Sequence, residues 1–175
     1  MLYVEWEADP EVRLTVFGRK VVDYTRLAKF ISNARQLYGF EQMGIDPWKK
    51  KSFEEACEKA RYQEDGTVDP SFKMPEIIDF AQGYKDMSPG IAALERFVVE
   101  GWLKHDNCPI LTSAVCSAII VRDGKLNRMF VKDKSYNRID AAVAAAMACG
   151  LASRPKEVKC EYLAAWKQVN GVWNG

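Results

Sequence analysis

The chain has 175 residues, with 48% hydrophobic and 28% charged residues, which suits one globular domain with a sizeable core. Its formal net charge of +1 excludes nucleic-acid binding driven by a global field, so any such binding must use local patches. No apolar run approaches the roughly 20 residues that span a bilayer. Five cysteines without a CxxC pair, and His105 as the only histidine, indicate a reducing compartment without a disulfide framework or zinc site.

Hydrophobic periodicity divides the chain into strands and helices. We predict strands at 13–17, 40–45, 76–81, 118–122 and 129–132, and helices at 21–38, 52–62, 89–100, 109–117 and 139–151. Asp23 or Thr25 can cap the first helix and Gly39 closes it, while Asp123-Gly124-Lys125 is a hairpin turn signal. Strands that alternate with helices, plus one hairpin, predict an α/β fold with one mixed sheet.

Two helix starts are predicted from local capping signals. Ser52, with Glu55 three residues later, forms a capping box, and Ser88 precedes Pro89 at a first helical position. Trp48, which follows the strand at 40–45, is interpreted as a packed anchor.

The helix at 139–151 consists almost wholly of small apolar residues, so it can lie close against a sheet. Cys149 on this helix should be a small core residue. Asp140 lies in the first turn, where the helix dipole favours a carboxylate. If it is buried, it needs a partner or a metal ion; otherwise it is a capping acid, and the residue pattern leaves both readings open.

Carboxylates at strand ends and helix starts are the remaining chemical signal, because the sequence contains no Walker motif and no GxGxxG. Asp46 follows a predicted strand, and α/β sheets place functional groups at the carboxyl ends of strands. If Asp46 and Asp140 converge, they form the oxygen-only site that Mg²⁺ or Mn²⁺ favours. Asp46-Pro47 is equally a routine turn.

Positive charge is concentrated between Arg122 and Arg138, a segment that contains six basic residues and two acidic ones. Such a run is usually a solvated hairpin, and it is also the kind of local patch that contacts phosphates.

Five segments, in this order and spacing, resemble the nuclease half of the large terminase subunit of tailed bacteriophages. They are Val21-Val22-Asp23-Tyr24, Gly44-Ile45-Asp46-Pro47-Trp48, Gln82-Gly83-Tyr84-Lys85-Asp86-Met87-Ser88-Pro89, Leu94-Glu95-Arg96 and Arg138-Ile139-Asp140-Ala141. The resemblance covers about residues 12–152. We therefore expect a single nuclease-type domain over 1–175, with a C-terminal tail at 153–175 and no ATPase domain.

The resemblance implies a ribonuclease H-like mixed sheet flanked by helices, and a metal-dependent endonuclease that cuts concatemeric viral DNA during packaging. It implies a two-metal site for Mg²⁺ or Mn²⁺, with Asp46 and Asp140 as the second and third of three acids. Lys85, Lys134 and Arg138 are then candidates for contacts with DNA phosphates. The implied partners are double-stranded DNA, the terminase small subunit and the portal protein, in the cytoplasm of a bacterial host.

One part of the family pattern is missing from the sequence. The first acid lies on an opening strand upstream of Val21-Val22-Asp23-Tyr24, and residues 1–10 do not look like that strand. We expect that the chain begins after this strand, as a fragment, a split-gene product or a prophage remnant. Glu5, Glu7 or Asp9 could substitute for the first acid, but their spacing does not support this role. The alternative is a catalytically incomplete remnant or a DNA- or portal-docking module of the same fold. A resolvase or ribonuclease is the third reading.

Overall fold

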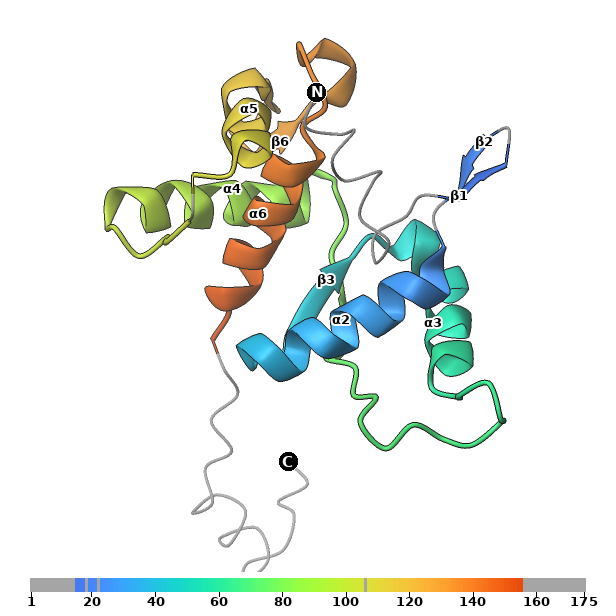
Figure 1. Cartoon of the computed structure of the whole chain (residues 1–175). Helices are drawn as coiled ribbons and strands as arrows, with labels where there is room; N and C mark the ends of the chain where they lie inside the picture. Colours follow the sequence, from blue (N-terminus) through green and yellow to red (C-terminus); the bar gives the residue numbers. More distant parts are fainter. Residues whose placement is uncertain (1–14, 18, 22, 106, 156–175) are drawn as a thin grey trace, which may run out of the picture.

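The computed structural model of the chain describes residues 15–17, 19–21, 23–105 and 107–155 (Figure 1). Its helices are α2 (Tyr24–Tyr38), α3 (Pro47–Ala60), α4 (Tyr84–Val99), α5 (Pro109–Ser117), the short 3₁₀ helix η1 (Lys132–Lys134) and α6 (Asp140–Ala152). Its strands are β1 (Thr15–Phe17), β2 (Arg19–Val21), β3 (Gln42–Ile45), β4 (Glu76–Asp79), β5 (Ile120–Arg122) and β6 (Arg128–Phe130). The tail at 153–175 lies outside the described residues from 156 onward.

The mixed α/β character is confirmed, but the prediction of one mixed sheet is wrong for the described residues. The strands form three two-stranded sheets: β1–β2 and β5–β6 are antiparallel, and β3–β4 is parallel. Each strand has only three or four residues, so each pair carries few ladder hydrogen bonds. Local alternation predicts a strand, whereas the joining of pairs into one sheet depends on contacts between distant segments.

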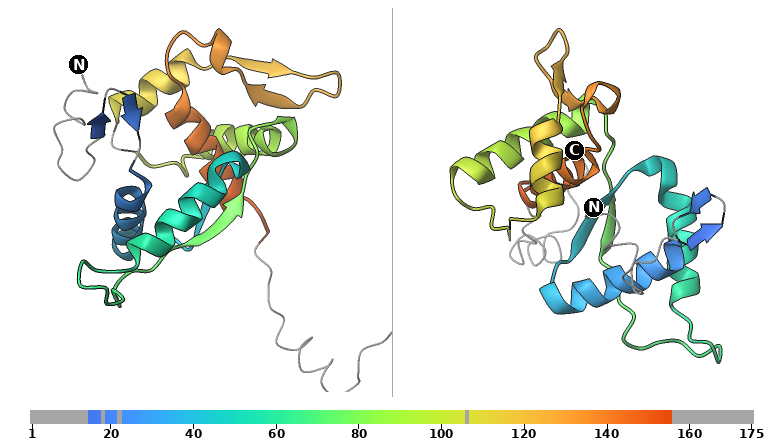
Figure 2. Two further views of the ribbon diagram at one scale, coloured as in Figure 1. Left: turned by 90° about the vertical axis from the view of Figure 1, so that its right-hand side faces the viewer. Right: turned by 45° about the horizontal axis from the view of Figure 1, so that its top comes forward.

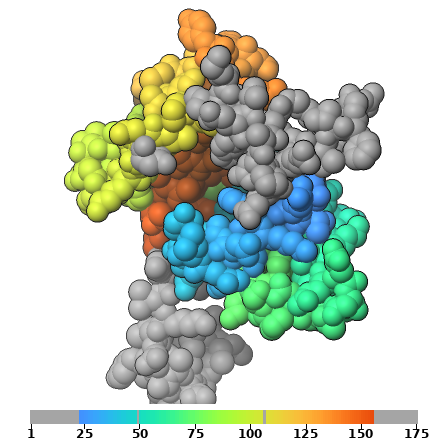
Figure 3. Space-filling model, viewed as in Figure 1, coloured from blue at the N-terminus to red at the C-terminus, as the bar shows by residue number. Residues whose placement is uncertain are grey.

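The β3–β4 pair is the middle of three layers (Figures 1 and 2). Met43, Ile45 and Ile77 pack into a hydrophobic cluster with Ala28 of α2 and Phe53 of α3. The alternate side chains of β4 enter a second cluster on the opposite face, built from Ile78, Phe80, Met87, Ile91, Ile139, Val143 and Ala146. Because successive side chains of a strand point to opposite faces, one short strand pair supports both cores. Figure 3 shows α2 and α6 at the surface of the face seen in Figure 1.

Where local end signals are unopposed, the predicted elements are confirmed. Asp23 caps α2 by accepting hydrogen bonds from the N–H groups of Thr25 and Arg26, and Gly39 ends the helix with φ of 69°. That φ lies in the left-handed region, which glycine adopts without strain. The short helix α5 and the β5–β6 hairpin also form where they are predicted.

The starts of α3 and α4 differ from the prediction. The helix α3 begins at Pro47, with Asp46 as its cap, and α4 begins at Tyr84, after Gly83. Ser52 and Ser88 therefore lie inside helices, and Pro89 is accommodated within α4. Met87 and Ile91 are each 1% exposed, and their burial needs a continuous helix across Pro89. Tertiary packing thus outweighs the local start signal.

Small residues let α6 approach both β3 and α4. A Cβ atom added to Gly90 of α4 would lie 2.8 Å from the carbonyl oxygen of Ala146, and one added to Gly150 would lie 3.0 Å from the Cα of Gly90. The predicted small-residue helix is confirmed, and Cys149 is buried as expected. The close backbone approach of α6, however, is to the helix α4, whereas it meets β3 through the side chains of Met147 and Leu151. None of the described helices has the length and hydrophobicity required to cross a bilayer.

Candidate metal centre

Asp46 lies at the carboxyl end of β3 and begins α3. Its Oδ1 accepts a hydrogen bond of 3.0 Å from the backbone N–H of Trp48, and Pro47 occupies the first turn, where its missing N–H costs nothing. One carboxylate oxygen is thus used for capping, and the side chain remains partly exposed. Trp48 is 86% exposed, so its interpretation as a packed anchor is wrong.

The alternation of β3 places Asp46 on the α6 face. A Cβ at Gly44 would point at Met147 and Leu151 of α6, at 3.4 and 3.2 Å from their nearest side-chain atoms. Asp46 follows two residues later with an extended backbone, so its side chain leaves the strand on the same face.

Asp140 is the first residue of α6 and is not buried. Its Oδ1 lies 3.0 Å from the ammonium nitrogen of Lys132, and its side chain is 63% exposed. The N-cap position is Ile139, with no side-chain hydrogen bond, so Asp140 does not cap the helix in the strict sense. Asp140 therefore has a partner of opposite charge, Lys132, eight residues upstream, although it is not buried.

The N-terminal end of α6 and the carboxyl ends of β3 and β4 lie at the same end of the molecule. Phe80, just after β4, lies beside the C-terminal end of α6: its ring is 3.1 Å from a Cβ added to Gly150. Gln82, two residues further along the chain, lines a pocket with Val143, which lies two turns closer to the start of α6. The helix therefore runs antiparallel to the strands. Asp140 lies about 10 Å along the axis beyond Met147, and Asp46 about 7 Å along the strand beyond Gly44. Convergence of their carboxyl groups on one ion stays a prediction.

A third carboxylate at this edge, Asp79, was missed by the sequence analysis. It is paired with Ile45 in the β3–β4 register, so it lies beside Asp46 along the strand ends. Alternation directs it away from α6, toward α3, where Lys50 holds it at 2.8 Å. This hydrogen bond raises the pKa of Lys50. The position beside β3 could have been found only from the parallel register, and the pairing makes Asp79 a structural acid.

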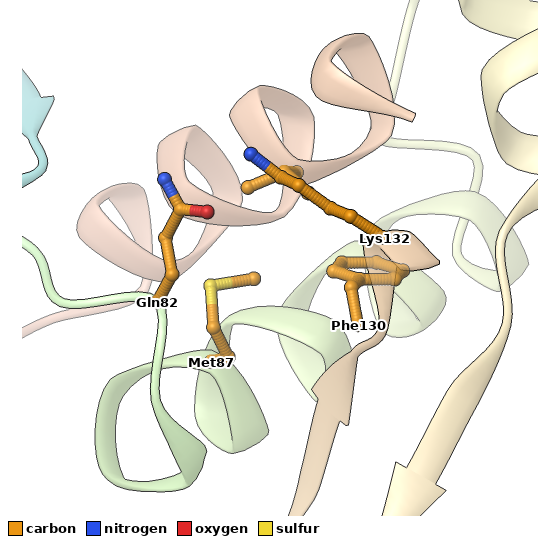
Figure 4. A pocket seen from close by; sticks show the side chains of 5 residues that line it. Gln82, Met87, Phe130 and Lys132 are labelled. Atoms are coloured by element: carbon orange, nitrogen blue, oxygen red, sulfur yellow. The ribbon is translucent and has the colours of Figure 1, made fainter. Parts of the chain in front are cut away.

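A pocket of about 130 Å³ adjoins Asp140. It is lined by Gln82, Met87, Phe130, Lys132 and Val143. Figure 4 shows Lys132 reaching across the pocket toward α6, with the amide of Gln82 on the far side. Lys132 is a second residue that the sequence analysis missed. No motif marks it, because its meeting with Asp140 depends on the turn made by η1.

The three cations named as candidates for phosphate contacts are all exposed. Lys85 lies in the first turn of α4, Lys134 ends η1 and Arg138 precedes α6. Lys134 and Arg138 lie six and two residues before Asp140 in the chain, and Lys85 follows β4 by six residues. Contact with DNA stays a prediction for all three.

Among the described residues, the oxygen donors of Asp46 and Asp140 are of the kind that one hard cation accepts, and no third acid completes a two-metal set. Mg²⁺ usually keeps several waters and binds through one or two carboxylates plus substrate phosphates, which Asp46 and Asp140 match. Within residues 15–17, 19–21, 23–105 and 107–155, no group of three or more His, Cys, Asp or Glu side chains is placed to hold a metal ion.

Replacing Asp46 with alanine is expected to lower the free energy of unfolding by about 1 kcal/mol, because the N-cap of α3 is lost. Asp46→Asn should leave stability almost unchanged, since asparagine caps as well as aspartate does. Urea denaturation of the two variants measures this difference. An equal loss in both would show that the negative charge, and not the cap, stabilises α3.

Comparison with known proteins places these residues in a wider context. Residues 2–155 match a family model described as the terminase large subunit, endonuclease domain. The terminase large subunit of Enterobacteria phage HK97 is 29% identical over 132 residues, which cover 75% of this chain and 24% of that protein. The crystal structure of the HK97 bacteriophage large terminase matches with a TM-score of 0.68 and 28% identity, over 85% of this chain and 28% of that one. The chain thus spans about a quarter of the length of these relatives.

Proposed function

The chain belongs to the family of terminase large subunit endonuclease domains, and from this we propose that it is the nuclease part of a bacteriophage DNA-packaging enzyme. It acts on double-stranded DNA, and Asp46 and Asp140 together hold a divalent ion, Mg²⁺ or Mn²⁺. The proposal is supported by the family match and by two positions at the same end of the molecule: Asp46 directly follows β3, and Asp140 is the first residue of α6.

When bound, the divalent ion would neutralise charge on a DNA phosphate. The protein residues have separate tasks. The cap to Trp48 fixes one oxygen of Asp46 and leaves the other free to bind an ion. Asp140 has a fixed backbone at the start of α6, where the dipole favours its negative charge. Lys85, Lys134 and Arg138 attract and position the phosphate backbone.

The finer parts of this function follow from the family. The substrate is concatemeric viral DNA, cut around packaging, and the working partners are the terminase small subunit and the portal protein in the cytoplasm of the bacterial host. The strand pairs belong to a ribonuclease H-like arrangement. Hydrolysis requires a further carboxylate beside Asp46 and Asp140, and none of the described residues supplies it.

A second candidate function is favoured by one observation: the described residues contain no cluster of three metal-binding side chains. A protein that keeps the fold and the basic surface without a complete acid set would bind DNA or the portal and would not cut. This reading describes a docking module or a remnant of a prophage.

A plasmid-nicking assay with Mn²⁺ tests these alternatives. We expect the chain of 175 residues to nick weakly or not at all, because two carboxylates do not fix the ions that align water and leaving oxygen. Weak nicking that Asp46→Asn and Asp140→Asn each remove would support the proposed function. Nicking that neither substitution changes would overturn it.

Two further results of the same assay are informative. Robust nicking that either substitution abolishes would mean that the acid set is complete within this chain. DNA binding without nicking, and without any response to Mn²⁺, would favour the docking module.

A further inference from the structure

Lys132 connects two features that the proposed function leaves separate. Its ammonium nitrogen lies 3.0 Å from Oδ1 of Asp140, and its stem lines the pocket opposite Gln82 (Figure 4). Both partners of the ion pair are accessible, with side chains that are 50% and 63% exposed. The ammonium group therefore has room to move, while its backbone is held between β6 and the turn of η1.

An ammonium group and a divalent ion compete for the same carboxylate. Lys132 lies at Oδ1 of Asp140, and a divalent ion bound to the same small carboxylate would lie close enough to the ammonium group for the two cations to repel each other. Lysine carries its charge on a flexible stem with four methylene groups, so it can leave one partner and reach another without backbone change. The pocket beside Asp140 offers the amide of Gln82 as a second polar wall.

We propose that Lys132 is the resident counter-ion of Asp140, which a divalent ion must displace, and that the released ammonium group then binds a DNA phosphate over the pocket beside Gln82. The proposal rests on the proposed function, since it takes Asp140 as a ligand of the ion. Lys132 acts on metal binding through Asp140, so it is a positioning residue for that step and a substrate contact for the next one.

This arrangement couples metal binding to DNA binding. Without an ion, Lys132 is engaged and contributes little to phosphate binding. With an ion on Asp140, the same lysine is free, and the ion and the lysine both face the incoming phosphate. The other basic residues would attract DNA with or without the ion, whereas Lys132 would bind a phosphate only when the ion occupies Asp140.

Isothermal titration with Mn²⁺ alone tests the first half. We expect Lys132→Met to bind Mn²⁺ about two- to fivefold more tightly than the wild type, the range that an exposed ion pair allows. Lys132→Arg should restore wild-type affinity, because arginine can also pair with Asp140. Lys125→Met removes the same charge from the exposed β5–β6 turn and serves as the control, with an expected change below about twofold.

The outcomes separate this inference from the proposed function. Equal tightening in Lys132→Met and Lys125→Met would show only a general field effect and would overturn the counter-ion role. If Asp140→Asn binds Mn²⁺ as tightly as the wild type does, Asp140 is not a ligand of the ion, and the proposed function fails as well. Weaker binding in Asp140→Asn with no change in Lys132→Met would overturn this inference alone.

The salt dependence of binding to a short DNA duplex tests the second half. In Mn²⁺, the slope of log affinity against log salt should be smaller by about one in Lys132→Met than in the wild type, the signature of one lost phosphate contact. Without a divalent ion the two slopes should agree. Equal slopes in Mn²⁺ would mean that the released lysine does not reach a phosphate.

Discussion

Phe80→Ala is expected to lower the free energy of unfolding by about 3–5 kcal/mol, the usual cost of removing a large buried aromatic side chain. Phe80 is 1% exposed, and it lies directly after β4 at the centre of the cluster shared with α4 and α6. Its ring contacts the positions of Gly90 and Gly150, where the two helices approach most closely. The guanidinium of Arg154 lies over the same ring at 5.2 Å.

Removing an exposed aromatic side chain should lower the free energy of unfolding far less, so Tyr136→Ala is the matched control. Tyr136 is 87% exposed, and its removal should change stability by less than about 0.5 kcal/mol. Urea denaturation of both variants, followed by circular dichroism, gives the two values. Similar losses would show that the α4–α6 core does not depend on Phe80 as its centre.

Elements with unopposed local signals are predictable from this sequence. The helix α2 has a cap in Asp23 and a left-handed glycine at its end, and α6 is a run of strong helix formers, so both form where their residues indicate. The β5–β6 hairpin follows from its turn, in which Asp123 accepts hydrogen bonds from Lys125 and Asn127.

Elements with competing signals are not predictable in the same way. The Ser52–Glu55 capping box is a valid start signal, but Asp46-Pro47 lies five residues earlier and provides an equally good one. In the structure the earlier signal starts the helix, which runs through Ser52 and buries Phe53 (2% exposed) in the cluster under α2 and α3. For α4, which begins at Tyr84, the burial of Met87 favours a start before Pro89.

The residues of the candidate site also fall into two groups, those that the sequence predicts and those that it does not. Asp46 and Asp140 are singled out by their predicted strand-end and helix-start positions and also by the family motifs, and the structure confirms both positions. Lys132 and Asp79 were not found, because each acquires its meaning from a distant partner. The pair of Lys132 with Asp140 requires the η1 turn, and the position of Asp79 requires the parallel register with β3. No periodicity encodes either contact.

The second large effect concerns the response of stability to Mn²⁺. A ligand that binds only the folded state stabilises it, by about 1.4 kcal/mol at a concentration tenfold above its dissociation constant. For a chain of this size that corresponds to a rise in Tm of roughly 3–6 °C. If Asp46 and Asp140 share the ion, each contributes charge and an oxygen ligand, so loss of either should remove most of the rise.

Asp46→Asn and Asp140→Asn are suited to this test because neither changes the volume of the side chain appreciably. Asparagine at 46 keeps the cap of α3, so its Tm without metal should match that of the wild type. Asp79→Asn is the control for a carboxylate at the same strand edge that points the other way, toward Lys50. It should keep the full response to Mn²⁺.

Thermal unfolding with and without Mn²⁺ shows whether Asp46 and Asp140 hold one divalent ion between them. We expect a rise in Tm for the wild type and for Asp79→Asn, and almost none for Asp46→Asn or Asp140→Asn. A rise of the same size in all four proteins, or in none of them, would contradict a shared ion.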